Sequence, residues 1–383
     1  MNIKKYFPSA NKYVYFDSAA MGLKPKMAIK ANNYFYNNIS VSTRSSDTKL
    51  GNLVNNTIFE TKKKIMNLVD ASIPQEIIFT SGTTESINMF ANMFKELLKE
   101  DDEIIIDELN HSSNMFPWIS IAKQVKAKII ISSNVIENIT NKTKLISIAQ
   151  ETNSFNKVYD IDLLSLICKQ KKIILFNDAA QSVLHYKASL NLFDAIAFST
   201  NKFYGPTGLG ILAVNKELLA KFKPFKLGGG VIKSVENDAK SFSVNDGLDV
   251  FEAGTPNIAG IFMFNKSLDF FNLIGYEKSN NIIKELSIYL HKKLQEVKNI
   301  KISSKPGDII VLFNIDNVFC QDVSSYLAKH NIYTRAGSFC VKMLDNIYDN
   351  QGFVRISLGI YNTKKDIDKL VNTLKKAKTF IVI

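Results

Sequence analysis

Residues 172–214, KIILFNDAAQSVLHYKASLNLFDAIAFSTNKFYGPTGLGILAV, contain three apolar runs separated by polar and turn-forming residues. Short apolar runs bounded in this way are typical of buried β-strands. Asp178 follows the first run and Lys202 follows the second, so a carboxylate and an amine lie at the ends of neighbouring predicted strands. A buried charge is costly unless it meets a partner. These two side chains therefore mark one edge of the predicted sheet as a candidate site.

The same alternation of strand and helix signals extends over most of the chain. Residues 76–82 predict a strand, and residues 83–99 predict a helix because their apolar residues recur at helical spacing. Further strand signals occupy residues 101–107, 127–133 and 143–150, and residues 112–124 predict a helix among them. This order predicts an α/β fold with a doubly wound, largely parallel sheet, whose ligands bind outside the carboxyl ends of the strands.

The pattern changes after residue 257. Residues 258–275 and 279–297 predict two long helices, which short strands and a last helix follow. We therefore expect a large domain over residues 1–264, with an N-terminal segment that packs toward the small domain. The small α+β domain is expected over residues 265–383.

Composition restricts the classes of protein to which the chain can belong. Of its 383 residues 46% are hydrophobic and 11% aromatic, which is enough for packed cores in more than one domain. No apolar run reaches the roughly 18 residues of a membrane span, and the N-terminus lacks the apolar core of a signal peptide, so we expect a cytoplasmic protein without a membrane partner. The net charge of +12 comes from scattered lysines, without the basic stripe of a nucleic-acid-binding protein.

The three cysteines, Cys168, Cys320 and Cys340, are widely spaced and form no C-x-x-C pair. Their number and spacing predict neither a disulfide framework nor a metal site, and they fit a reducing compartment. Cys168 and Cys320 accompany apolar patterns that indicate core positions. Cys340 differs, because it lies close to Arg335 in the sequence RAGSFC.

Polar residues at other strand ends add to the candidate site. Thr83 and Thr84 open a helix after a strand and a glycine, and the N–H groups and dipole of such a terminus bind phosphate. Ser-Gly-Thr-Thr is also an ordinary helix N-cap. His111 follows another strand end, although a solitary loop histidine is more often a surface or packing residue. Arg355 lies within a short apolar strand, where an arginine favours a bidentate anion such as a carboxylate.

A phosphate-binding helix terminus, an aspartate and a lysine are together what pyridoxal phosphate requires. In this interpretation Lys202 forms a Schiff base with the cofactor, and Asp178 keeps the pyridine nitrogen protonated. The helix terminus at Thr83 holds the phosphate. These residues predict a pyridoxal-phosphate enzyme.

With these motifs in place, the sequence resembles the class V aminotransferase family, and within it the type II (SufS-like) cysteine desulfurases and selenocysteine lyases. The resemblance extends almost from end to end, through YFDSAAMGLKPK, IIFTSGTTESIN, NDAAQS, STNKFYGPTGLGIL, LGGGVI, FEAGTPN, RAGSFCVKM and VRISLGIYNT. It implies the type I fold of pyridoxal-phosphate-dependent transferases. In that fold a large domain holds a mostly parallel sheet between helices, and a smaller α+β domain carries the cysteine loop.

The resemblance also implies a role for each matching residue. Lys202 resembles the Schiff-base lysine, and Asp178 resembles the partner of the pyridine nitrogen. The other cofactor contacts that it implies are His111 stacked on the ring, Gln181 at the phenolic oxygen, Thr83, Thr84, Ser199 and Asn201 at the phosphate, and Thr255 from the neighbouring subunit of a homodimer. In the small domain it implies that Arg355 clamps the substrate carboxylate, that Cys340 is the sulfur acceptor, and that Arg335 flanks this thiol.

The chain departs from the family at residues next to two of these positions. Asn201 precedes Lys202 where the family usually has histidine, and an amide donates a hydrogen bond to phosphate without a charge. Ser338 and Phe339 replace two histidines beside Cys340. A histidine relay to the thiol is therefore not expected here.

Two further matches stay open at the level of sequence. The family's SNVLG segment reads QETNS at residues 150–154, so Gln150, Glu151 and Asn153 are all candidates for the role of its asparagine. Arg44, in STRSSD, matches an active-site arginine only loosely.

These residues predict a cysteine desulfurase that converts L-cysteine to L-alanine and holds the sulfur on Cys340 as a persulfide, for iron–sulfur cluster assembly. A thiol with a pKa near 8.5 is mostly protonated at neutral pH, so a nearby cation such as Arg335 would favour the thiolate. The expected partners are L-cysteine, a second copy of the chain, and a sulfur-acceptor or scaffold protein.

Two alternatives remain open. One is another class V enzyme, such as a selenocysteine lyase, aminotransferase or kynureninase-like hydrolase, in which Cys340 is not the acceptor. The other is a non-enzymatic binding protein with the same fold. The sequence identifies neither the sulfur acceptor, nor a preference for cysteine over selenocysteine, nor a need for an activator.

Overall fold

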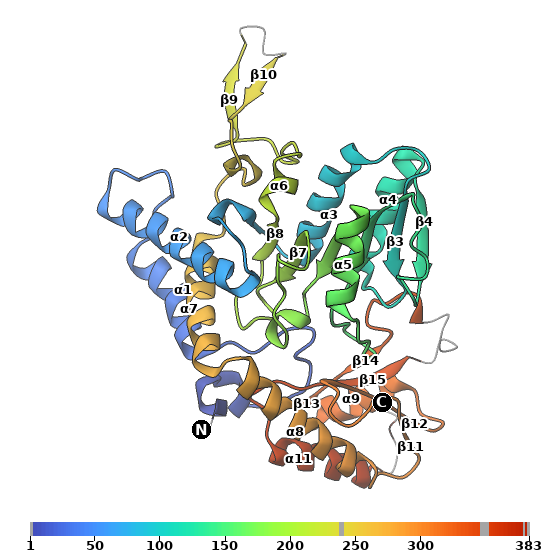
Figure 1. Cartoon of the computed structure of the whole chain (residues 1–383). Coiled ribbons are helices and arrows are strands. Elements are labelled where there is room, and N and C mark those ends of the chain that lie inside the picture. The colour runs from blue at the N-terminus through green and yellow to red at the C-terminus, as the bar shows by residue number, and fades with distance from the viewer. Residues whose placement is uncertain (1–2, 237–240, 345–351, 378–379, 381–383) are drawn as a thin grey trace. The chain divides into compact units, whose positions relative to one another are not determined.

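The computed structural model describes residues 3–236, 241–344, 352–377 and 380 (Figure 1). The chain divides into two compact units. The large unit consists of residues Ala28–Gln150 and Tyr159–Asp269, and the small unit of Met1–Met27, Glu151–Val158 and Phe270–Ile383. Both this division and the expected boundary at 264/265 fall within helix α7 (Ile258–Ile274). The small unit thus includes two segments from earlier in the chain.

A seven-stranded sheet, with strand order β2-β8-β7-β6-β5-β3-β4, forms the centre of the large unit. Its strands are β2 (Ile77–Thr80), β3 (Glu103–Asp107), β4 (Lys128–Ser132), β5 (Thr143–Ile148), β6 (Ile174–Asp178), β7 (Ala195–Ser199) and β8 (Gly210–Val214). Each lies within a strand signal of the sequence. Strands β4, β3, β5, β6 and β7 pair in parallel, whereas β8 is antiparallel to β7 and β2. The predicted α/β fold with a mostly parallel sheet is confirmed.

Helices pack on this sheet and bury its central strands. They are α3 (Thr83–Phe94), α4 (Phe116–Val125) and α5 (Ile161–Lys171). The predicted helix at 83–99 ends as a 3₁₀ turn, η4 (Lys95–Leu97), and the one at 112–124 begins as a 3₁₀ turn, η5 (Ser112–Asn114). Strands covered by helices read as continuous apolar runs, which explains the strand signals in the sequence.

An aromatic core joins these helices to the sheet. Phe90 of α3 lies with its ring centroid 5.1 Å from that of Phe176 in β6 and 6.1 Å from that of Trp118 in α4. All three side chains are fully buried. A second apolar cluster contains Phe35 of α1 (Lys26–Asn38), Val54 of α2 (Lys49–Val69) and residues of α7. Figure 1 shows α1, α2 and α7 side by side.

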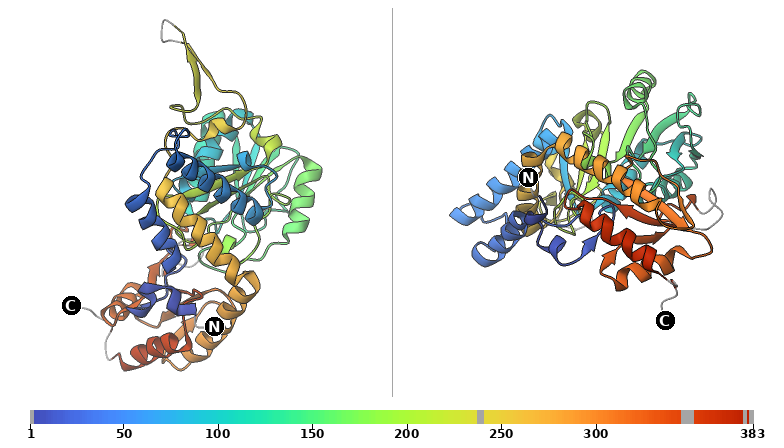
Figure 2. Two further views of the ribbon diagram at one scale, coloured as in Figure 1. Left: turned by 90° about the vertical axis from the view of Figure 1, so that its left-hand side faces the viewer. Right: turned by 90° about the horizontal axis from the view of Figure 1, so that it is seen from below.

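The large unit has two smaller elements beyond the sheet. Helix α6 (Lys216–Leu219) follows β8. Strands β9 (Ile232–Val235) and β10 (Phe242–Val244) pair antiparallel and extend away from the sheet (Figures 1 and 2).

The small unit contains a four-stranded antiparallel sheet in the order β11-β12-β15-β14. Its strands are β11 (Ile300–Ile302), β12 (Ile310–Ile315), β14 (Arg335–Gly337) and β15 (Phe353–Ser357). Its helices are α8 (Tyr276–Leu294), α9 (Cys320–Lys329) and α11 (Lys364–Lys376), of which α8 and α11 lie side by side (Figure 1). The predicted helices and strands after residue 257 are confirmed.

The N-terminal segment belongs to the small unit. Strand β1 (Val14–Tyr15) pairs in parallel with β13 (Ile332–Tyr333). The buried ring of Phe7 contacts Tyr361 and Phe270, at centroid distances of 4.9 and 5.3 Å. Burial of such rings stabilises the placement of the segment by roughly 1.5–3 kcal/mol per side chain. This packing positions Asp17, two residues after β1.

Candidate active site and its family

Asp178 is the last residue of β6, and its side chain is buried. The backbone N–H of Ala180 donates a hydrogen bond to Oδ1 of Asp178 over 3.1 Å. Burial raises the pKa of Asp178, while the charge of Lys202 and the Ala180 hydrogen bond act in the opposite direction. Because burial is the larger effect, another cationic N–H beside this carboxylate would stabilise it.

Lys202 lies in the turn that follows β7, the strand parallel to β6. The Thr200 side chain fixes this turn by donating to the carbonyl oxygens of Pro206, at 2.8 Å, and Leu209, at 3.0 Å. A Cβ at Gly205 would lie only 2.9 Å from Thr200, so the turn requires glycine there. The ammonium of Lys202 and the carboxylate of Asp178 are close enough for one charge to alter the pKa of the other group. The sequence-predicted pair is thus brought together.

Helix α3 begins at Thr83 against the end of β7. The Thr83 N–H donates to Oγ of Ser199 over 2.6 Å, and the two hydroxyls lie 2.7 Å apart. Strand β8 also approaches the start of α3 closely, because a Cβ at Gly210 would lie 2.4 Å from the backbone of Gly82, the N-cap residue of the helix. Two predicted phosphate ligands, Thr83 and Ser199, therefore lie together at a helix N-terminus, where an anion is favoured.

The loop that carries His111, here called the histidine loop, is attached to the N-terminus of α3. The hydroxyl of Thr84 lies 2.8 Å from that of Ser113, and the Ser113 N–H donates to Nδ1 of His111 over 3.1 Å. Thr84 and Ser113 thus connect His111 to the first turn of α3.

Two buried asparagines, which we did not predict as site residues, hold the histidine loop to the end of β5. Nδ2 of Asn110 donates to the carbonyl of Ser147 over 2.9 Å, and Nδ2 of Asn114 donates to that of Ile148 over 3.3 Å. Trp118 Nε1 donates to Oδ1 of Asn114 over 3.0 Å. In the sequence, these asparagines could have been recognised as two amides that flank a histidine after an apolar strand.

The other predicted cofactor residues lie on nearby segments of the large unit. Gln181 is buried three residues after Asp178, and Asn201 is half-buried beside Lys202. Thr255 is exposed on the segment before α7, and the N–H of Gly254 donates to the carbonyl of Gly229 over 2.9 Å.

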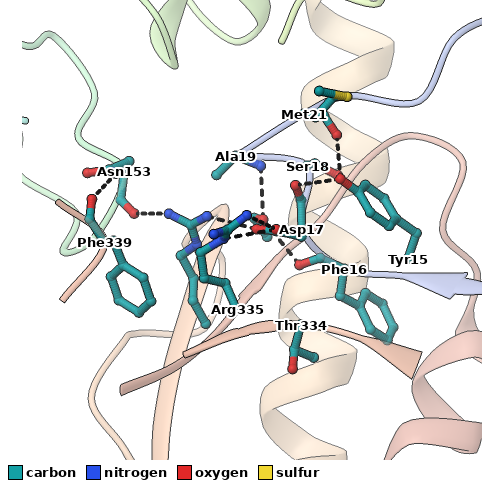
Figure 3. A network of polar contacts seen from close by, with 12 residues as sticks. Tyr15, Phe16, Asp17, Ser18, Ala19, Met21, Asn153, Thr334, Arg335 and Phe339 are labelled. Atoms are coloured by element: carbon teal, nitrogen blue, oxygen red, sulfur yellow. Dashed lines mark hydrogen bonds and ion pairs between the residues drawn. The ribbon is translucent and has the colours of Figure 1, made fainter. Parts of the chain in front are cut away.

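In the small unit, Arg335 of β14 and Arg355 of β15 are direct cross-strand partners. Arg355 is only 2% exposed, and burial lowers its pKa, while Asp17 opposes that effect. NH2 of Arg355 donates to Oδ1 of Asp17 over 2.8 Å. Nε and NH2 of Arg335 donate to Oδ2 of Asp17 over 3.0 and 2.8 Å (Figure 3). Asp17 therefore bridges the two arginines. Its signal in the sequence was a carboxylate directly after the apolar run YVYF.

The loop that carries Cys340 is held by the same network. Nδ2 of Asn153 donates to the carbonyl of Phe339 over 2.8 Å, and NH1 of Arg355 donates to the carbonyl of Asn153 over 2.9 Å (Figure 3). The guanidinium of Arg355 lies 4.7 Å from the centre of the Phe339 ring. Phe339 and Cys340 have φ of 56° and 59°, a left-handed conformation that is strained for both. The surrounding contacts thus maintain an unfavourable loop backbone.

The three cysteines differ in exposure, because Cys168 and Cys320 are buried and Cys340 is exposed. Burial raises the pKa of Cys168 to about 12 and also raises that of Cys320. Cys340 is therefore the accessible thiol of the chain.

Gln150 and Asn153, two of the candidates for the role of the family's asparagine, make contacts in different units. Gln150 exchanges hydrogen bonds with Asn177 of β6, at 3.0 and 3.1 Å, within the large unit. Asn153 instead contacts the arginine and the cysteine loop of the small unit. Arg44 is exposed and packs close to Gly229, where a Cβ would lie 2.5 Å from its NH2.

Two kinds of feature are absent from the part of the chain that the structure describes. No group of three or more histidine, cysteine, aspartate or glutamate side chains in residues 3–236, 241–344 and 352–377 could hold a metal ion. Among the same residues, no helix combines the length and apolar character needed to cross a bilayer.

The aminotransferase class V family matches residues 14–370. The chain belongs to this family. Class V aminotransferases use pyridoxal phosphate, and the cofactor of this class V enzyme is pyridoxal phosphate. Its residues fit that group, because a buried carboxylate, a lysine at the next strand end and a helix N-terminus lie in one unit. The predicted resemblance to the class V aminotransferase family and the type I fold are confirmed.

Named relatives match this class V enzyme over nearly its whole length. Probable cysteine desulfurases from Ureaplasma parvum and Borreliella burgdorferi are 33% and 34% identical, covering 97% and 98% of this chain and 96% and 95% of theirs. The solved structure of the cysteine desulfurase CsdA from Escherichia coli has a TM-score of 0.89 at 28% identity, over 97% of this chain and 96% of that one. A cysteine desulfurase from Thermococcus onnurineus in its apo form has a TM-score of 0.90 at 25% identity, over 98% and 96%.

Proposed function

We propose that this class V enzyme is a cysteine desulfurase that moves the sulfur of L-cysteine to Cys340 and releases L-alanine. The observation that carries the proposal is Cys340 itself, an exposed thiol on a strained loop tied to a buried arginine. The sulfur is supplied to iron–sulfur cluster assembly through an acceptor or scaffold protein. Homologues named cysteine desulfurase support this reaction.

The large unit holds the cofactor. Pyridoxal phosphate, when bound, withdraws electrons from the substrate Cα. Lys202 would hold the cofactor covalently before substrate arrives, and once the substrate amine has displaced it, its free amine would carry the proton that leaves Cα. Asp178 would accept a hydrogen bond from the pyridine nitrogen. The other contacts in this assignment are the ring face of His111, the amide of Gln181 at the phenolic oxygen, and Thr83, Thr84, Ser199 and Asn201 at the phosphate.

Arg355 binds the substrate carboxylate. Its guanidinium has five N–H donors, of which the structure pairs one with Asn153 and one with Asp17. Among the residues that the structure describes, nothing accepts a hydrogen bond from its buried Nε. A buried donor without an acceptor costs about 1–3 kcal/mol, and a carboxylate of the substrate would remove that cost.

Cys340 accepts the sulfur as a thiolate. The thiolate attacks the sulfur of L-cysteine, and the carbon–sulfur bond breaks with its electron pair remaining on carbon. Protonation of that carbon gives L-alanine, and Cys340 becomes a persulfide. No external oxidant or reductant is needed for this step. A thiol of the acceptor protein then removes the outer sulfur.

The functional enzyme is a cytoplasmic homodimer in this proposal. Thr255 is exposed on its own chain and reaches the phosphate of the neighbouring subunit. A single chain would then hold the cofactor incompletely.

The test is a single-turnover experiment with L-cysteine on the purified holoenzyme. Alanine is quantified, and the peptide that carries Cys340 is weighed for one added sulfur atom by mass spectrometry. Cys340→Ala is expected to release almost no alanine, whereas the control Cys168→Ala keeps the activity. Full alanine production by Cys340→Ala, or a keto acid in place of alanine, would exclude this function.

A further inference from the structure

The turn that carries Lys202 has an unfavourable backbone. Tyr204 and Gly208 have φ of 58° and 69°, in the left-handed region. Glycine adopts this conformation without strain, whereas a tyrosine stays in it only when the surrounding structure holds it there. Tyr204 is buried and lies two residues after Lys202. The placement of the lysine therefore depends on the contacts that fix this turn.

One face of helix α7, together with the residue before the helix, packs on this turn. Asn257, Gly260, Phe264 and Ser267 are separated by three, four and three positions, which places them on the same side of a helix. All four belong to the large unit, as the turn does. The buried ring of Phe264 lies 5.7 Å from that of Phe203, in an edge-to-face arrangement. The turn and α7 thus share one packed contact.

Ser267 contacts the strained residue directly. Its buried hydroxyl donates to the carbonyl of Tyr204, at 3.0 Å, and to that of Met263 in the preceding turn of α7, at 3.1 Å. A hydroxyl has one hydrogen, so the two carbonyls share it. The bond to Met263 is ordinary for a serine within a helix. The bond to Tyr204 instead joins α7 to the Lys202 turn.

Asn257 fixes the far end of the same turn. Its Nδ2 donates to the carbonyl of Gly208 over 3.1 Å, and its Oδ1 accepts from the N–H of Gly260 over 2.9 Å. The second bond caps the N-terminus of α7. A Cβ at Gly260 would lie 2.5 Å from Nδ2 of Asn257, so this glycine leaves room for the amide. One side chain therefore joins the start of α7 to the turn.

We propose that Ser267 and Asn257 are positioning residues for Lys202, which act through the turn that they bind. They favour the turn conformation from which the amine reaches the aldehyde of pyridoxal phosphate, where a carbon–nitrogen bond forms and one water molecule leaves. Without these contacts the turn adopts other conformations, and the apparent affinity for the cofactor falls with the competent fraction. The inference rests on the proposed role of Lys202.

The two residues are expected to contribute unequally. Ser267 holds the carbonyl of the buried Tyr204, whereas the carbonyl of Gly208 lies at an exposed position where water competes for it. Removal of the Ser267 hydroxyl should therefore have the larger effect.

The test compares two ligands that differ at the bond to lysine. The cofactor is removed from the purified holoenzyme, and the chain is titrated by calorimetry with pyridoxal phosphate and with pyridoxamine phosphate, which has the same ring and phosphate but no aldehyde. The variants are Ser267→Ala and Asn257→Ser, in which serine can still cap α7. Ser165→Ala is the matched control, because Ser165 is a buried serine of α5 whose hydroxyl donates to the carbonyl of Leu192 over 2.8 Å.

The expected result is a loss of affinity for the aldehyde alone. Ser267→Ala should bind pyridoxal phosphate about fivefold more weakly and Asn257→Ser about threefold, the range for loss of one hydrogen bond. Binding of pyridoxamine phosphate should change less than about twofold in both. Hydrogen exchange followed by mass spectrometry should be faster than in the wild type for the peptide covering residues 200–209. Ser165→Ala should alter neither the two affinities nor this peptide.

Equal weakening for both ligands would overturn the inference, because the variants would then disturb the ring or phosphate contacts. Unchanged affinity for pyridoxal phosphate, or a loss equal to that in Ser165→Ala, would overturn it too. If Ser267→Ala does not fold, Asn257→Ser decides by the same comparison, since its contact is exposed. Failure of the proposed role of Lys202 is separate. Reduction of the wild-type holoenzyme with borohydride would then attach the cofactor to a different lysine.

Discussion

Arg335 and Arg355 lie directly opposite each other on neighbouring strands, and one carboxylate, that of Asp17, accepts hydrogen bonds from both. Two cations in this register are unfavourable unless an anion lies between them. The same network reaches the Cys340 loop through Asn153. Substrate binding and sulfur transfer are thus expected to respond to substitutions at one connected group of side chains.

Lys202→Ala is expected to abolish covalent cofactor binding, because the turn after β7 offers its amine beside Asp178. The visible absorption band of the purified holoenzyme should disappear, and added pyridoxal phosphate should not restore it. The control is Lys216→Ala, an exposed lysine of α6, which should keep the band. A colourless wild type that gains no absorbance with the cofactor would contradict the assignment.

Asp178→Asn is expected to stabilise the apoprotein and weaken cofactor binding. Burial raises the pKa of Asp178 in the fold above the unfolded value of about 3.9. The folded state therefore binds this proton more tightly, so the stability contributed by Asp178 is complete below pH about 4 and is lost as the pH rises through the raised pKa. Asparagine removes that loss and keeps a hydrogen-bond acceptor for Ala180.

The measurement is the melting temperature of the apoprotein between pH 4 and 8, together with a cofactor titration. At pH 7 the variant should melt about 2 °C or more above the wild-type apoprotein, which corresponds to about 1 kcal/mol. At pH 4 the difference should vanish. A variant apoprotein less stable than the wild type at pH 7 would contradict this prediction, because it would show that neighbouring groups already offset the cost of burying the charged carboxylate.

Arg355→Lys is expected to raise the KM for L-cysteine at least about tenfold, since an ammonium cannot reproduce the bidentate geometry of a guanidinium. Lysine retains a charge beside Asp17 and so limits the loss of stability. Cofactor absorbance should remain, because the residue belongs to the small unit. Steady-state kinetics measure the effect, with Arg335→Ala as the comparison. An unchanged KM would mean that another cation holds the carboxylate.

Asn153→Ala is expected to slow persulfide formation about fivefold, because the Phe339 carbonyl loses a hydrogen bond worth about 1 kcal/mol. The left-handed Cys340 loop would then relax. Asn156→Ala is the matched control, since the exposed Asn156 donates a hydrogen bond to Asp308 and none to the Cys340 loop is described. Rapid-quench mass spectrometry of Cys340 gives the rate. Equal rates in the wild type and Asn153→Ala would show that this loop hydrogen bond does not affect persulfide formation.

Thr255→Asp is expected to weaken cofactor binding in the partner subunit, because its charge would repel the phosphate. Light scattering should first show a dimer. Heterodimers that combine Thr255→Asp with Lys202→Ala should regain one complete site, formed by the intact Lys202 of one chain and the intact Thr255 of the other. A monomer that binds the cofactor fully, or heterodimers with no such recovery, would refute the shared site.

Much of the fold was predictable, because its signals are local. The strands of the large sheet are apolar runs, and parallel strands buried on both faces must be apolar along their length. Asp178 and Lys202 could be assigned for the same reason, since each is a charged residue at the end of such a run. The matching of known motifs then supplied roles that periodicity alone could not.

The network around Asp17 was decided by the tertiary structure. Asp17 is 318 residues from Arg335 and 338 residues from Arg355, and no periodicity links positions so far apart. The different contacts of Gln150 and Asn153 also depended on the unit that each residue joins, because these neighbours in sequence belong to different units. Strand register placed two arginines in opposition, and burial made their shared anion necessary. Register and burial are properties of the packed chain, so only the folded molecule could reveal that one carboxylate near the N-terminus accepts hydrogen bonds from both arginines.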